Sequence, residues 1–154
     1  QSTAQVFFSD TRVPVANLLD EEGAGLKNTM KMFEHARGHV GLLSVGIARA
    51  AKEESIAYAQ QRKQFGKPIA GHQLIASKIA DMAMNIDAAR LMCQRVFGMM
   101  DAGERCDLQA SMAKAFATEM AVTVCRDAVQ LHGGTQACIP RSRHGGVREI
   151  TLFF

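Results

Sequence analysis

A basic segment, Gln61-Arg62-Lys63-Gln64-Phe65-Gly66-Lys67-Pro68, joins a long helical pattern to a turn. One arginine, two lysines and the amides of a turn can bind a phosphate, and a charge-assisted arginine contact is worth roughly 1.5–3 kcal/mol. The same cations can simply offset the dipole at the C-terminal end of a helix. The spacing alone leaves both interpretations open.

A second segment, Gln130-Leu131-His132-Gly133-Gly134, ends another helical pattern. Its two glycines allow a ligand to approach the backbone closely, and Gln130 carries both hydrogen-bond donors and an acceptor. An ordinary helix stop explains the glycines equally well.

Charged and histidine side chains of the first helical pattern are weaker candidates. Arg37 falls on its apolar face beside Glu34, so either a partner compensates this charge or the face reaches solvent there. His35 and His39 have the spacing of a metal-chelating pair on one helix face. No third ligand accompanies them, so we predict no metal site.

Three helical patterns must position these residues. The first spans about residues 24–61 and places on one face Leu26, Met30, Phe33, Arg37, Val40, Ser44, Ile47 and Ala51. The second ends at residues 101–103 and places on one face Ile75, Ile79, Met82, Ile86, Ala89, Cys93, Val96 and Met100. The third begins near Asp107, the predicted N-cap, and its face contains Met112, Phe116, Met120, Val124 and Ala128.

Apolar faces of this kind on long helices favour antiparallel packing of the helices. We predict an all-α fold, an up-down bundle of three long helices in which the fourth is missing or replaced. The apolar face left uncovered predicts a homo-oligomer. The expected organisation is an extended segment and connector at 1–22, the bundle at 23–134 and a divergent tail at 135–154. Gln5-Val6-Phe7-Phe8 predicts an edge strand in the first of these.

Composition narrows the class of protein. The chain has 154 residues, 47% of them hydrophobic, enough for one domain with a core. A net charge of +3, and a basic cluster in the tail without an aromatic platform, argue against nucleic-acid binding. No apolar run approaches the roughly 20 residues of a membrane span. Four cysteines without a C-x-x-C pair favour reduced thiols in a cytoplasm-like compartment. The missing initial Met suggests a piece of a longer protein.

Several motifs, in this order, resemble the C-terminal part of acyl-CoA dehydrogenases. Residues 6–19 resemble the end of that family's middle β-domain, and Gly23-Ala24-Gly25-Leu26 resembles the start of its first C-terminal helix. Residues 62–69 with His72-Gln73, and residues 128–134, are specific matches. The resemblance covers about residues 5–134.

The resemblance implies a four-helix bundle whose basic turn reaches the FAD of a neighbouring subunit. The residues implied in FAD binding are Arg62, Lys63, Gln64, Phe65, His72, Gln73, Gln130, Gly133 and Gly134. Glu34 and Arg37 match positions that face the acyl-CoA substrate. The implied partners are a second copy in a homodimer or homotetramer and an electron-transferring flavoprotein. The implied location is the cytoplasm, or the mitochondrial matrix in a eukaryote.

The family reaction removes the α-proton of an acyl thioester with a carboxylate while a β-hydride passes to the flavin. In most members the base is a Glu that would lie beyond Phe154. In a minority it precedes the residue matching Arg37, and that position is Ala36 here. We therefore expect no catalytic residue in this chain and dehydrogenation only in a full-length context. The alternative is a cofactor-free helical oligomerisation module derived from the family.

Overall fold

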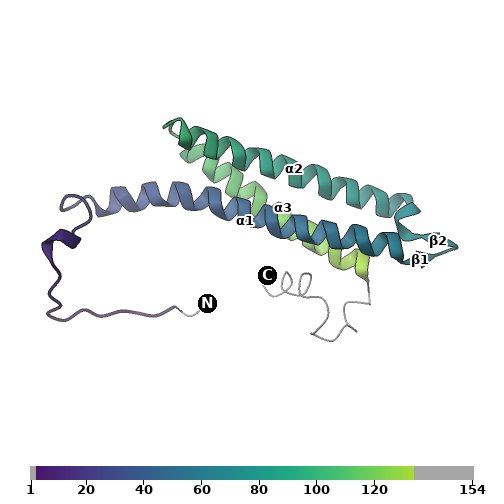
Figure 1. Ribbon diagram of the computed structural model, residues 1–154, viewed down its shortest axis with the longest axis horizontal. Coiled ribbons are helices and arrows are strands. Elements are labelled where there is room, and N and C mark those ends of the chain that lie inside the picture. Colours follow the sequence, from purple (N-terminus) through teal and green to yellow (C-terminus); the bar gives the residue numbers. More distant parts are fainter. Residues whose placement is uncertain (1–2, 134–154) are drawn as a thin grey trace. The chain divides into compact units, whose positions relative to one another are not determined.

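The computed structural model describes residues 3–133, which are mostly helical (Figure 1). Its long helices are α1 (Gly25–Gln61), α2 (Gln73–Asp101) and α3 (Asp107–His132). The strands β1 (Lys63–Gln64) and β2 (Lys67–Pro68) and two 3-10 turns, η1 (Val15–Asn17) and η2 (Ile69–Gly71), complete the described elements. These bounds confirm the predicted all-α class and its three long helices. The chain divides after Met32 into two compact parts.

The first part contains no β-strand among its described residues, so the strand predicted at residues 5–8 is wrong. A strand needs a neighbour that pairs with its amides and carbonyls, and residues 3–32 supply none. Near the start of α1, Asp20 accepts hydrogen bonds from the side chain of Asn28 (3.0 Å) and the amide of Glu21 (2.9 Å). These bonds lower the pKa of Asp20.

The turn between α2 and α3 is a Schellman motif. The amide of Gly103, at φ 69°, donates to the carbonyl of Met100 (3.0 Å), and the amide of Glu104 donates to the carbonyl of Met99 (2.9 Å). The predicted N-cap of α3 at Asp107 is wrong, because Cys106 holds that position and Asp107 is already helical. The Asp107 carboxylate instead accepts two hydrogen bonds from Arg105, at 2.8 and 3.0 Å.

The Arg105–Asp107 pair makes a pH-dependent prediction. Hydrogen bonds from Arg105, and then its charge, hold the pKa of Asp107 below its ordinary value. Stabilisation from this pair is therefore complete above the pKa of an unfolded aspartate and disappears as the pH falls through the folded pKa. We expect Arg105→Gln to raise the pKa of Asp107 in an NMR titration of its carboxyl carbon. Arg90→Gln, which breaks the exposed pair with Asp87, should leave the Asp107 titration unchanged.

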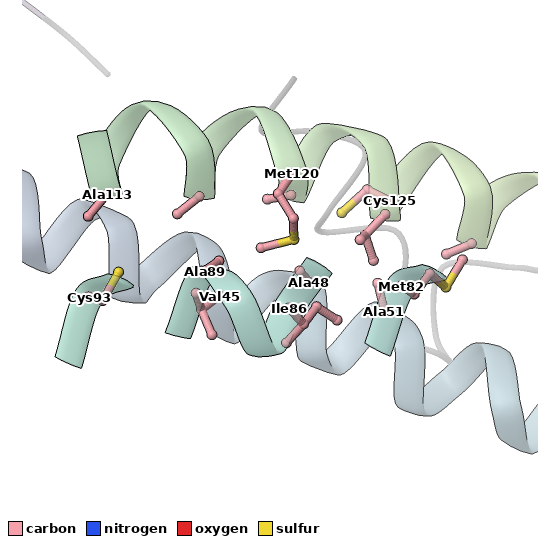
Figure 2. Close-up of a cluster of buried hydrophobic side chains, with 14 of the residues drawn as sticks. Val45, Ala48, Ala51, Met82, Ile86, Ala89, Cys93, Ala113, Met120 and Cys125 are labelled. Atoms are coloured by element: carbon pink, nitrogen blue, oxygen red, sulfur yellow. The ribbon is translucent and has the colours of Figure 1, made fainter. Parts of the chain in front are cut away.

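The three helices of the second part pack in an up-down-up arrangement. The Lys78–Asp127 ion pair joins the beginning of α2 to the end of α3, so these helices are antiparallel. A Cβ added at Gly38 would meet Val96 and Phe97 of α2, whereas one at Gly41 would meet Cys93, so α1 runs antiparallel to α2. Figure 2 shows side chains of all three helices meeting in one core, among them Val45, Met82 and Met120. The predicted up-down topology is thus confirmed.

The buried stripe of α1 differs from the predicted one. Phe33 and Val40 are 43% and 40% exposed, whereas Ser44 and Ala51 are buried as predicted. The buried residues of α1 are mostly small: Gly38, Gly41, Ser44, Val45, Ala48, Ala51, Ser55 and Ala59. The prediction followed the large apolar side chains, but small residues are what allow helix backbones to approach closely.

Gly41 allows the closest approach that the structure describes for a glycine. An added Cβ there would lie 2.8 Å from Cys93 Sγ and 3.7 Å from the carbonyl oxygen of Ala113. Nothing lies within 4 Å of a Cβ added at Gly46, five residues further along α1. Gly41 therefore fills a packing role that Gly46 does not have.

Because of this difference, replacing glycine by alanine should change the stability of the protein in opposite directions at the two positions. Gly46→Ala should stabilise the protein by about 1 kcal/mol through helix propensity. Gly41→Ala gains the same propensity but overpacks the core, which typically costs about 1–3 kcal/mol, so we expect a net loss. Urea denaturation measures both. Cys93→Ala in the Gly41→Ala background should recover part of the loss, and equal effects of the two alanines would contradict the packing described here.

The second and third helices follow their predicted faces to different extents. The predicted face of α2 is confirmed, since Met82, Ile86, Ala89, Cys93 and Val96 are buried and the rest half-buried. On α3, Met120, Val124 and Ala128 are buried as predicted. Met112 and Phe116 are 51% and 38% exposed, because Ala113 and Ala117 take the positions in the core.

Large apolar side chains therefore remain at the surface of this chain. Phe116 borders a shallow hollow of about 230 Å³ between α2 and α3, lined by Asn85, Phe116, Glu119, Met120, Thr123 and Val124. Val40, Leu43 and Met112 are also exposed. The surface has the apolar character predicted for a three-helix arrangement. Within residues 3–133, no helix combines the length and the apolar character needed to cross a membrane.

Candidate functional site

The basic segment after α1 forms a small β-hairpin. Helix α1 ends at Gln61, and the chain then forms β1, which pairs antiparallel with β2. Phe65 and Gly66 turn the chain with φ values of 53° and 80°. The amide of Ile69 donates to the carbonyl of Arg62 (2.8 Å) and closes the hairpin. We refer to residues 62–68 as the hairpin corner.

Side chains of the hairpin corner divide into two groups. Lys67 donates to the carbonyl of Gly71 (2.9 Å), and His72 Nε2 lies 3.3 Å from the carbonyl oxygen of Gln64, so both stabilise the turn. Arg62 and Lys63 are exposed and form no ion pair with any residue in 3–133. Phe65 is 92% exposed, and its ring meets the ring of His72 edge-on with centroids 6.0 Å apart. Two cations and an aromatic ring thus face solvent.

The C-terminal end of α3 provides a second corner, residues 130–133, which we call the α3 corner. Gly133 has φ 56°, and its amide points back to the carbonyls of Val129 (3.1 Å) and Gln130 (3.2 Å). The Nδ1 of His132 lies 2.8 Å from the carbonyl oxygen of Ala128. The side chain of Gln130 is exposed. Gly134, also a predicted site residue, lies outside the described residues.

The two corners lie at the same end of the bundle. The ring of Tyr58, in the last turn of α1, stacks on the ring of His132 with centroids 4.6 Å apart and an interplanar angle of 27°. Figure 1 shows the hairpin and the end of α3 on the same side of the drawing. Segments about 70 residues apart in sequence are therefore brought together by helix topology.

Glu34 and Arg37 lie elsewhere. Burial, and then the charges of Glu34 and Asp107, raise the pKa of the Cys106 thiol, which locates Glu34 near the start of α3. About 40 Å of helix separates Glu34 from Gln61 at 1.5 Å per residue. Both Glu34 and Arg37 are half-buried, and Arg37 forms no ion pair within residues 3–133. A single copy of this chain does not bring these two residues to the hairpin corner.

The histidine pair on α1 has other contacts. His39 Nδ1 lies 2.8 Å from the carbonyl oxygen of His35, and its ring packs against Phe97 at 5.1 Å. Within the described part of the chain, no three His, Cys, Asp or Glu side chains gather in a geometry suited to a metal ion. These observations give no support to a metal function for the pair.

The described cysteines are packing residues. Cys93, Cys106 and Cys125 are free and buried. Burial raises the pKa of each thiol, that of Cys125 to about 11. Thiols in this environment stay protonated near neutral pH and are poor nucleophiles.

Sequence reasoning missed Tyr58. It is the single tyrosine of the chain and lies one helical turn before Arg62. Its position next to the basic segment is visible in the sequence. The contact with His132, however, depends on how α1 and α3 align. No motif within either segment indicates that alignment.

Comparisons with known proteins agree with the motifs. The family model described as "Acyl-CoA dehydrogenase, C-terminal domain" matches residues 23–147. The chain is 44% identical over 134 residues to Probable acyl-CoA dehydrogenase YngJ of Bacillus subtilis (strain 168), which covers 87% of this chain and 35% of that protein. This chain thus spans about a third of the length of the curated relatives it matches.

Solved structures share the fold. Butyryl-CoA dehydrogenase from Megasphaera elsdenii aligns with a TM-score of 0.82 at 37% identity, over 96% of this chain and 39% of that chain. The structure of PigA with FAD and proline aligns with a TM-score of 0.83 at 30% identity, over 94% of this chain and 37% of that chain.

Proposed function

Since this chain belongs to the acyl-CoA dehydrogenase family, as part of its C-terminal domain, we propose that its hairpin corner and α3 corner bind FAD held by a neighbouring subunit. Arg62, Lys63 and Gln64 contact the pyrophosphate, and Phe65 packs beside it. His72 and Gln73 lie near the adenosine half. Gln130, Gly133 and Gly134 approach the pyrophosphate and ribityl chain.

The observation that supports this proposal is the convergence of both corners at one end of the bundle. Their chemistry fits a dinucleotide. Arg62 and Lys63 form no ion pair within residues 3–133, and an arginine can bind two phosphate oxygens in a bidentate manner. The exposed ring of Phe65 offers an apolar surface for a planar group. PigA, a similar structure, was solved with FAD.

The activity we propose for the full-length protein is the α,β-dehydrogenation of an acyl-CoA thioester. FAD supplies the hydride-accepting chemistry when it is bound. Glu34 and Arg37, near the other end of α1, face the acyl-CoA substrate. Because Ala36 cannot accept a proton, the α1 position that carries the base in a minority of the family supplies none here, and we expect this chain alone not to catalyse the reaction. An electron-transferring flavoprotein, the acceptor implied by the family resemblance, reoxidises the flavin.

The same proposal includes a homodimer or homotetramer, since the corners act on the cofactor of another subunit. The exposed apolar side chains of α1 and α3 support this assembly. Sedimentation velocity should show a dimer or larger species at micromolar concentration. A monomer under these conditions would contradict the assembly.

An NMR titration of the ¹⁵N-labelled chain with FAD tests cofactor binding directly. The amide resonances of Arg62, Lys63, Gln130 and Gly133 should shift together, with one common dissociation constant. Resonances near Arg95, on an exposed part of α2, should not move. No shift at millimolar FAD, or shifts at only one corner, would overturn the proposal.

The second candidate function is a helical oligomerisation module that binds no cofactor. The extensive exposed apolar surface favours it independently of either corner. An absorbance spectrum distinguishes the two candidates. Flavin that remains with the protein through gel filtration excludes the module, whereas an oligomer that never retains or binds FAD supports it.

A further inference from the structure

We propose that the stacked rings of Tyr58 and His132 are a positioning pair that fixes the hairpin corner relative to the α3 corner. This inference rests on the proposed function, because it assigns the pair a role in arranging the same FAD site. Neither side chain is proposed to touch the cofactor. The pair acts through Arg62 on one side and Gly133 on the other.

The backbone links each ring to its corner. The amide of Arg62 donates to the carbonyl of Tyr58 (2.9 Å), so the position of Tyr58 determines where Arg62 leaves the helix. The carbonyl of Arg62 in turn accepts from Ile69 (2.8 Å), which fixes the base of the hairpin. On α3, His132 directly precedes Gly133. A change in the distance between the rings therefore moves both corners.

The ring of His132 is itself held in place. With a proton on Nδ1, it donates to the carbonyl of Ala128, 2.8 Å away, which fixes the ring one turn below the end of α3. Both Tyr58 and His132 are half-buried. A nearly parallel stack at 4.6 Å between two fixed half-buried rings resists sliding of α1 along α3.

A second contact between helices also stabilises this end of the bundle, but it does not position the hairpin corner. Lys78 and Asp127 join α2 to α3 one turn further into the bundle. This ion pair positions α3 against α2 and has no backbone link to Arg62. Among the side-chain contacts described between helices, the ring pair is the one that connects the end of α1 to the end of α3.

Amide hydrogen exchange in the 154-residue chain tests the pair without any cofactor. Tyr58→Leu should accelerate exchange at Arg62 and Gly133 by roughly two- to tenfold, the range expected from losing an aromatic pair. Tyr58→Phe keeps the ring and should restore the slow exchange. His132→Leu should reproduce the effect of Tyr58→Leu from the other helix, which keeps the test decisive if one variant folds poorly.

The ring pair of His39, in the N-terminal half of α1, and Phe97 of α2 provides a matched control. Phe97→Leu should leave exchange at Arg62 and Gly133 unchanged, although it loses a ring contact between α1 and α2. If Tyr58→Leu and His132→Leu leave both amides unchanged, or if Phe97→Leu accelerates them equally, the positioning role is overturned.

A double-mutant cycle on FAD affinity connects the pair to the site. Tyr58→Leu should weaken FAD binding in the wild-type background and much less in the Arg62→Ala background, because its effect passes through Arg62. Additive losses would overturn that connection. A wild-type chain that shows linked amide exchange but no FAD shifts would overturn the proposed function and leave the ring pair as a positioning device for the two corners.

Discussion

Replacing Arg62 by alanine should weaken FAD binding by roughly ten- to hundredfold, the equivalent of one charge-assisted contact. The lower end of this range is the expectation, because Arg62 is exposed and solvent screens its charge. Helical content should not change, since the Arg62 side chain makes no described contact that supports the bundle. The titration of the labelled chain with FAD measures the affinity, and circular dichroism measures the helices.

Arg95→Ala is the matched control for this substitution. Arg95 is an exposed arginine in α2, far along the helix from the hairpin corner. Its removal changes the net charge of the chain by the same amount, so it separates a local contact from general attraction of an anion. Equal losses for the two variants, or an unchanged affinity for Arg62→Ala, would remove Arg62 from the site.

Met82→Ala should destabilise the second part of the chain by about 3 kcal/mol, within the range of about 2–5 kcal/mol for a buried methionine. Met82 is 2% exposed and belongs to the largest fully buried side chains described. It packs at the level of Ala51 and Cys125, which are too rigid and too small to fill the space it leaves (Figure 2). The loss is a large share of a typical domain stability, and urea denaturation measures it.

Met84→Ala is the control for this prediction. Met84 lies two residues away on the same helix but is 62% exposed, so its truncation should change stability by no more than about 0.5 kcal/mol. Both substitutions alter helix propensity by the same amount. A similar effect of the two would mean that α2 presents a different face to α1 and α3.

The helices could be predicted because their boundaries depend on local features. Gly103 ends α2 by adopting a positive φ, and Gly66 and Pro68 mark the turn that follows α1. The face of α2 was also readable, since large apolar side chains mark it and both neighbours pack against that face. Periodicity is informative where the buried side chains are large.

The structural predictions that failed concern residues whose conformation or burial depends on contacts with other parts of the chain. The strand at residues 5–8 has no neighbour among residues 3–32. Asp107 does not hold the N-cap position of α3 because the helix begins one residue earlier than predicted, with Cys106 as the N-cap. The stripe of α1 was misassigned because Gly41 and Ala48 carry no strong hydrophobic signature. Gly41 instead matters for the tight contact with Cys93 and Ala113, which only the packed structure reveals.

For the candidate site, too, the local features were predictable from the sequence and the contacts between helices were not. Each corner was recognisable from its own residues, because basic side chains before a turn and glycines after a helix are local patterns. Their meeting at one end of the bundle, through Tyr58 and His132, requires the relative alignment of α1 and α3. The distance between Glu34 and the hairpin corner follows from the same topology.

Phe65 has a consequence for how this protein responds to selection. A bulky residue at φ 53° occupies a conformation that costs an L-amino acid roughly 1–2 kcal/mol and that glycine adopts freely, and its ring gains almost no burial in return. Directed evolution for heat resistance alone should therefore discard the phenylalanine. Selection for flavin retention should keep it. Libraries selected for heat resistance and for flavin retention should therefore differ in the residue at position 65.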